Sequence, residues 1–75
     1  MTSVDIVFRY GTPPTELEAR AINALREVYG IRKISFDEKE RTVRVEYDAT
    51  RLAADEVENL LRRGGLEVRE RVHLV

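Results

Sequence analysis

Apolar and polar residues alternate in three short stretches of the chain, which is the pattern of strands that bury one face. The stretches are residues 4–10, 33–37 and 42–47, and the polar run 37–41 between the last two predicts a hairpin turn. A fourth strand is predicted after Gly65, and Glu70 interrupts its apolar face. Its apolar residues are Leu66, Val68, Val72 and Leu74.

Two stretches between the strands have the period of amphipathic helices. The first helix is expected to begin at Pro14 or Thr15, because Thr15 and Glu18 have capping-box spacing, and to end at Gly30. The second is expected to start after Ala53 as N-cap and to end at Gly64-Gly65. The predicted apolar positions are Leu17, Ala21, Ala24, Leu25 and Val28 in the first helix, and Leu52, Val57, Leu60 and Leu61 in the second.

The order strand, helix, strand, strand, helix, strand predicts an α+β fold. Both helices must cover one face of a four-stranded antiparallel sheet, as in a ferredoxin-like βαββαβ sandwich. Phe8, Tyr10 and Tyr47 alternate in step with the other apolar residues of their strands, so their rings are expected to face the core. The other face of the sheet is predicted to be polar and of mixed charge, with Asp5, Val7, Arg9, Lys33, Ser35, Thr42, Arg44, Glu46, Glu67, Arg69, Arg71 and His73.

The length of the chain limits the number of domains, and its charge limits the classes of partner that it can bind. A chain of 75 residues supports one core, so residues 1–75 are expected to form a single domain. Thirteen basic and fourteen acidic residues lack the surplus of positive charge that nucleic-acid binding requires. The strand aromatics Phe8, Tyr10 and Tyr47 are expected to face the core, so the sheet is not expected to offer aromatic rings for base stacking. The absence of a long apolar run and of a basic, apolar leader indicates a cytoplasmic protein without membrane insertion.

Candidate chemistry is sparse. The chain has no cysteine and one histidine, His73, which cannot form a zinc site alone. Gly11-Thr12-Pro13-Pro14 joins a strand to a helix, but two prolines remove two of the N–H groups that a phosphate loop needs. The acidic turn lacks the glycine and final glutamate of a calcium loop. We therefore expect no enzyme activity and no cofactor.

From Val4 to Val68 the chain resembles the heavy-metal-associated domain, the small module of copper chaperones and of the N-terminal tails of metal-pumping P-type ATPases. The most specific stretch is residues 43–48. The residues that carry the resemblance are Gly11-Thr12, Glu18-Ala19-Arg20, Ala24-Leu25, Val28-Tyr29-Gly30-Ile31, Val43-Arg44-Val45-Glu46-Tyr47-Asp48 and Gly64-Gly65-Leu66-Glu67-Val68. The resemblance implies the same βαββαβ fold.

The chain departs from this family at the metal site. The family binds Cu(I) or Zn(II) through a Gly-Met-x-Cys-x-x-Cys loop, whose soft thiolates suit a soft ion. Here Pro14 and Leu17 stand at the cysteine positions and Thr12 at the methionine, so no metal site is predicted. Leu66 and Ala53 also differ from the family's usual residues. The degenerate loop is Gly11, Thr12, Pro13, Pro14, Thr15, Glu16 and Leu17.

The resemblance implies a docking or regulatory role in metal trafficking, because the family contacts partners through this end and the helical face. The partner would be a similar domain, a transporter's cytoplasmic domain or a second copy. One alternative is a self-associating or small-molecule-sensing domain, and another is weak divalent metal binding by carboxylates such as Glu16 and Glu18. The candidate docking residues are Thr12, Pro13, Thr15, Glu16, Arg20 and Arg63.

Overall fold

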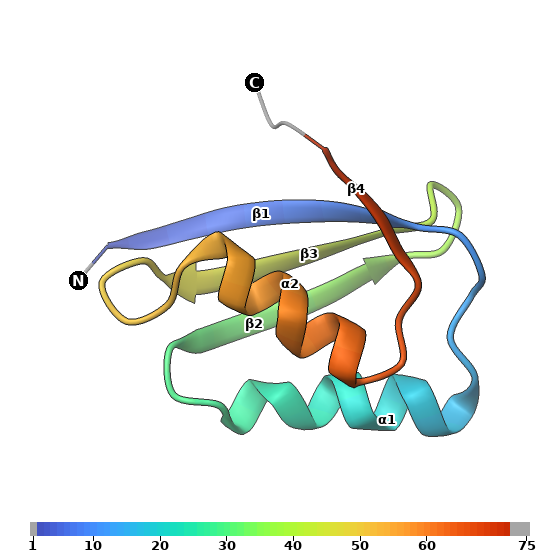
Figure 1. Cartoon of the computed structure of the whole chain (residues 1–75), viewed down its shortest axis with the longest axis horizontal. Helices are drawn as coiled ribbons and strands as arrows, with labels where there is room; N and C mark the ends of the chain where they lie inside the picture. The colour runs from blue at the N-terminus through green and yellow to red at the C-terminus, as the bar shows by residue number, and fades with distance from the viewer. Residues whose placement is uncertain (1, 73–75) are drawn as a thin grey trace.

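The computed structural model describes residues 2–72 and shows four strands and two α-helices (Figure 1). A short 3₁₀ segment, Leu25–Glu27, follows the first helix. His73, Leu74 and Val75, which were expected to extend the last strand, lie outside the described residues. The elements are β1 (Ser3–Tyr10), α1 (Glu16–Ala24), β2 (Ile31–Asp37), β3 (Thr42–Asp48), α2 (Ala54–Arg63) and β4 (Val68–Val72).

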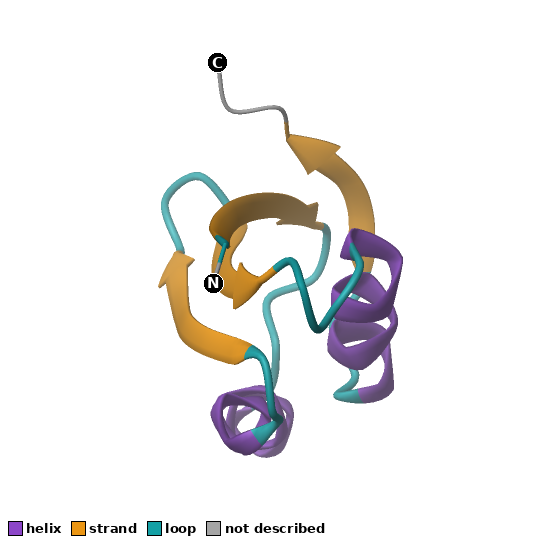
Figure 2. Ribbon diagram, turned by 90° about the vertical axis from the view of Figure 1, so that its left-hand side faces the viewer, coloured by secondary structure: helices purple, strands orange, loops and turns teal. Residues whose placement is uncertain are grey.

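The strands form one antiparallel sheet in the order β2-β3-β1-β4. Both helices lie on the same side of this sheet, and the other side is left open (Figure 2). The predicted ferredoxin-like βαββαβ sandwich is therefore confirmed. The three strand stretches read from alternation are also confirmed, with β2 beginning two residues earlier than its pattern indicated.

The core fills the space between the sheet and the helices. Phe8 is fully buried, and Tyr10 and Tyr47 are nearly so, as their parity predicted. From α2, Val57 and Leu61 enter the same cluster, while Leu52 packs against it from the loop before that helix rather than from within it.

The buried face of α1 differs from the predicted stripe. Ile22 is 0% exposed and is the only fully buried residue of this helix, whereas Leu17 is 76% exposed. Ala21 and Ala24 are exposed as well, and only Leu25 and Val28 of the predicted stripe are half-buried. The predicted stripe was therefore wrong, because the helix is rotated so that Ile22 rather than Leu17 faces the core. Ile22 packs closely against Gly64, where an added Cβ would lie 3.0 Å from a side-chain carbon of Ile22.

The end of α1 was also predicted too late. The α-helix ends at Ala24 and tightens into the 3₁₀ segment, so Gly30 is not its C-cap. Gly30 instead has a positive φ of 107°, a conformation that residues with a side chain rarely adopt. It turns the chain into β2, and its carbonyl accepts a hydrogen bond of 2.7 Å from the Asp48 N–H.

β4 starts at Val68, two residues later than predicted, and an irregularity in its pairing with β1 reverses its last side chains. Tyr10 pairs with Val68, but Arg9 pairs with Glu70, so Arg69 is an extra residue. A bulge of this kind shifts every later residue to the opposite face. Arg71 therefore lies on the helix side, where its guanidinium contacts Asp55 and Glu58 of α2. Val72 lies on the open face, so the faces predicted for Arg71 and for Val72 were both wrong.

Ala53 is confirmed as the N-cap of α2, and we expect Ala53→Ser to stabilise the protein by about 0.5–2 kcal/mol. Its backbone is extended, and its N–H donates to the Glu56 carboxylate at 3.0 Å, but its side chain has no acceptor for the first N–H groups of the helix. A serine hydroxyl supplies one. Urea denaturation measures the change, and Ala49→Ser in the preceding turn is the control. An unchanged midpoint for Ala53→Ser would contradict this capping geometry.

Candidate functional site

Three connections meet at one end of the molecule, and they form the candidate site (Figure 1). They are the loop between β1 and α1, the loop between α2 and β4, and the turn between β2 and β3. The Gly11 N–H donates to the Glu67 carbonyl at 3.1 Å, and the Tyr10 N–H donates to the Arg41 carbonyl at 2.9 Å. Backbone hydrogen bonds therefore tie the first loop to both of its neighbours. We call this region the loop end.

Polar side chains hold the degenerate loop in place. The Thr12 hydroxyl donates to a Glu67 carboxylate oxygen at 2.8 Å, and the same carboxylate pairs with Arg69 at 2.7 Å. The Thr12 hydrogen bond, followed by the charge of Arg69, lowers the pKa of Glu67. The Arg69 guanidinium lies over Gly11, where an added Cβ would be 2.5 Å from the Arg69 Nε, but this exposed side chain can move aside. Thr12 thus makes a hydrogen bond that holds the first loop against the α2–β4 loop.

We expect Thr12→Val to raise the pKa of Glu67 toward its ordinary value. Because the pKa is lowered in the folded state, this hydrogen bond stabilises the protein above the ordinary glutamate pKa, and the effect is lost as the pH falls through the lowered value. Carboxyl NMR titration measures the shift.

The matched control for this titration is Thr50→Val at the opposite end of β3. The Thr50 hydroxyl donates to the Asp48 carboxylate at 2.6 Å and lowers the pKa of Asp48. This variant should raise the pKa of Asp48 and leave that of Glu67 unchanged. A Glu67 pKa that is the same with and without Thr12 would contradict the assigned loop contact.

The start of α1 forms the other side of the loop end. Thr15 and Glu18 make the predicted capping box, with hydrogen bonds of 2.9 and 3.2 Å, so this prediction is confirmed. Glu16 pairs with Arg20 on the helix surface at 2.8 Å. Of the degenerate loop's remaining positions, Pro14 is half-buried. All six predicted docking residues are exposed, namely Thr12, Pro13, Thr15, Glu16, Arg20 and Arg63.

A hollow of about 300 Å³ opens beside the two prolines. Its aromatic wall is Tyr10 and Phe36, whose rings meet edge to face with centroids 6.1 Å apart. Burial raises the pKa of the Tyr10 phenol, and the nearby Glu38 carboxylate raises that pKa further. Phe36 also packs against the core cluster, and Glu38 lies in the exposed β2–β3 turn. The lining residues are Tyr10, Pro13, Pro14, Ala19, Phe36 and Glu38.

The loop end offers no obvious metal site. Across residues 2–72, no three or more His, Cys, Asp or Glu side chains gather in a way that could hold a metal ion. Glu16 forms an ion pair with Arg20, and Glu18 accepts a hydrogen bond from the Thr15 N–H, so both carboxylates already have partners. No helix within the described part of the chain is long and apolar enough to cross a membrane.

The fold has a solved counterpart. It matches the yeast copper transporter domain Ccc2A, determined in solution in its apo and Cu(I)-loaded states, with a TM-score of 0.73 and 18% identity. The match covers 92% of this chain and 94% of that one. No protein-family model and no curated protein matches the sequence. The chain thus shares the fold of this copper transporter domain, and at 18% identity the likeness shows the fold alone.

Proposed function

We propose that this protein is a docking or regulatory module of metal trafficking that works without a thiolate-bound metal ion. The observation that carries the proposal is that the loop end is held in place by internal hydrogen bonds and exposes an apolar side chain. In a fold shared with a copper transporter domain, the first loop is fixed by the protein's own hydrogen bonds and leaves Leu17 76% exposed. A large apolar side chain so exposed, in the first turn of α1 directly after the first loop, is available to a partner.

The loop end combines the usual features of a small protein interface, an apolar anchor with a polar rim. Leu17 and Pro13 are the exposed apolar residues, and the hollow beside Pro13 has room for one partner side chain. Arg20 and Arg63 are exposed charges on the two helices. Such charges guide association and orientation more than they add affinity, so the contact is expected to weaken with salt.

Site-specific photo-crosslinking tests this proposal, because the chain has a matched pair of exposed residues. Leu17 and Tyr29 are 76% and 71% exposed, and they lie at opposite ends of the segment that contains α1. A photoreactive residue at position 17 should give one discrete adduct in the producing cell. The same group at position 29 should not give that adduct.

Mass spectrometry then identifies the adduct. A transporter's cytoplasmic domain, a similar domain of a metal carrier or a second copy of this chain supports the proposal. Equal labelling from both positions, or an adduct with a protein unconnected with metals, overturns it.

The structure offers less support for self-association through strand edges. On the edge strand β2, the outward carbonyl of Ile34 accepts a hydrogen bond of 2.9 Å from Arg26. On the other edge, β4 is short and presents Arg69, Glu70 and Arg71. A capped carbonyl and charged residues are both features that discourage edge pairing. Light scattering at high protein concentration is expected to show a monomer unless the loop end itself pairs.

A further inference from the structure

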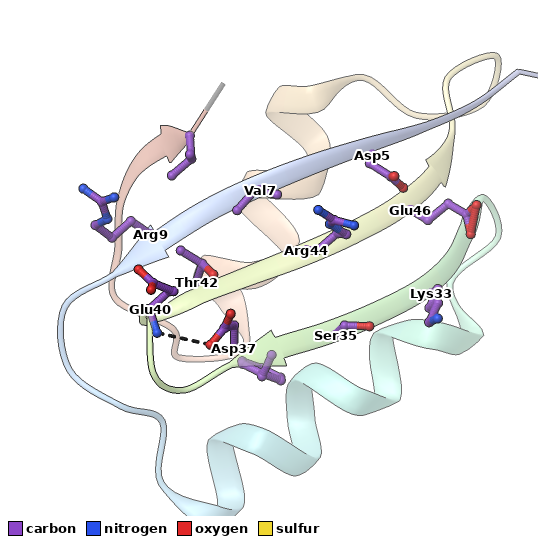
Figure 3. A pocket seen from close by; sticks show the side chains of 12 residues that line it. Asp5, Val7, Arg9, Lys33, Ser35, Asp37, Glu40, Thr42, Arg44 and Glu46 are labelled. Atoms are coloured by element: carbon purple, nitrogen blue, oxygen red, sulfur yellow. Dashed lines mark hydrogen bonds between the residues drawn. The ribbon is translucent and has the colours of Figure 1, made fainter. Parts of the chain in front are cut away.

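The open face of the sheet contains a hollow of about 640 Å³ that the proposed function does not use (Figure 3). Strand register arranges its side chains in rows that cross the sheet. One row is Asp5, Glu46 and Lys33, and the next is Val72, Val7, Arg44 and Ser35. Val72 belongs to the second row because the β4 bulge turns it to this face. The volume of the hollow falls within the range of small-molecule sites.

The first row places two carboxylates directly opposite each other. Asp5 pairs with Glu46 in the β1–β3 register, and like charges at this spacing destabilise a sheet. Within residues 2–72, neither carboxylate has an ion-pair partner. Lys33 is opposite Glu46 but stays outside ion-pair distance. A ligand ammonium between the two carboxylates would relieve their repulsion.

The second row pairs a cation with an apolar floor. Arg44 lies between Val7 and Ser35, and it forms no ion pair with any other residue in 2–72. Its guanidinium can therefore receive a carboxylate through two parallel hydrogen bonds. Val7 is only 7% exposed although it faces the open side, and Val72 is its cross-strand neighbour. Together the two valines form a surface for an apolar group.

We propose that this hollow binds a free α-amino acid with an apolar side chain. The ammonium would lie between Asp5 and Glu46, the carboxylate on Arg44, and the side chain on the two valines. Rows on one face of a strand are about 7 Å apart. An amino acid's ammonium and carboxylate, with a hydrogen bond at each end, span about 8 Å. The mixed charges of the hollow disfavour a simple anion or cation and favour a zwitterion.

NMR titration of the full chain with L-leucine tests the inference, using three ligands that each lack one group. Leucinamide lacks the carboxylate, 4-methylpentanoate lacks the ammonium, and glycine lacks the apolar side chain. Leucine should give saturable shifts in the amides of residues 5–9, 33–37 and 42–46. Each truncated ligand should bind at least tenfold more weakly, the loss of one good polar or apolar contact.

Variants separate binding from folding. Arg44→Gln and the pair Asp5→Asn with Glu46→Gln should each weaken leucine binding at least tenfold. The carboxylate pair variant should also unfold at a temperature equal to or above that of the wild type, because a repulsion is removed. Arg20→Gln on α1 is the control and should bind leucine normally.

Three results would overturn the inference. The first is the absence of saturable shifts up to the solubility limit of leucine. The second is a set of shifts confined to the loop end. The third is a set of sheet-face shifts that follow protein concentration rather than ligand, which would make this face a contact between two copies of the chain.

Discussion

Phe8→Ala is expected to lower the free energy of unfolding by about 3–5 kcal/mol. Phe8 is 0% exposed at the centre of β1, and its ring contributes to the single core between the sheet and the helices. Removing it leaves a cavity that surrounding strands cannot fill. Because a domain of this size has only a few kcal/mol of stability, much of the variant should be unfolded at room temperature.

Far-ultraviolet circular dichroism with urea denaturation measures this effect. Tyr29→Ala is the matched control, since it removes an aromatic ring that is 71% exposed and only stacks with Arg51 at 3.9 Å. Its cost should stay below about 1 kcal/mol. Equal costs for the two variants would mean that the face of β1 has been assigned to the wrong side.

Ile22→Ala is expected to cost about 2–5 kcal/mol, whereas Leu17→Ala should stay within about 0.5 kcal/mol of the wild type. Both substitutions shorten an aliphatic residue of α1, but Ile22 is 0% exposed and Leu17 is 76% exposed. The pair therefore measures the rotation of the helix. Thermal denaturation of the two variants under identical conditions gives the comparison.

The reverse order of these two costs would restore the stripe that the sequence suggested. Leu17 would then be buried, and the proposed docking surface would lose its apolar anchor. Leu17→Ala serves a second purpose, because a folded variant with normal stability can be used to test partner binding directly.

The strands could be read from the sequence because alternation is a local property. Each of Val43, Val45 and Tyr47 is separated from the next by one polar residue, and a one-residue slip would place all three in water. All three are buried. The capping box of α1 was equally readable, since Thr15 and Glu18 contact each other within one turn.

The face of α1 could not be read in this way, because the helix carries two apolar stripes. Leu17, Ala21 and Ala24 form one, and Ala19 and Ile22 lie on the other. Local periodicity does not choose between them. The choice depends on the α2–β4 loop, where Gly64 allows close contact with Ile22 and Gly65 with Glu18. These residues are more than forty positions away in the sequence.

The same limit applies to β4 and to the two hollows. The bulge that moves Arg71 and Val72 depends on pairing with β1, and no residue of β4 signals it. Phe36 and Glu38 join the prolines only because the β2–β3 turn meets the first loop in the folded chain. Sequence reasoning placed a loop between β1 and α1 but missed the surfaces that tertiary structure builds around it.

We propose that the loop end functions without coordinating a metal ion, and a chelator competition with Cu(I) is the test. A coloured Cu(I) chelator complex is titrated with the protein while its absorbance is followed. We predict that the chelator keeps its copper at every protein concentration, because the loop carries Pro14 and Leu17 in place of thiolates. Transfer of copper to the protein in a 1:1 ratio, abolished by Glu16→Ala with Glu18→Ala, would contradict this account.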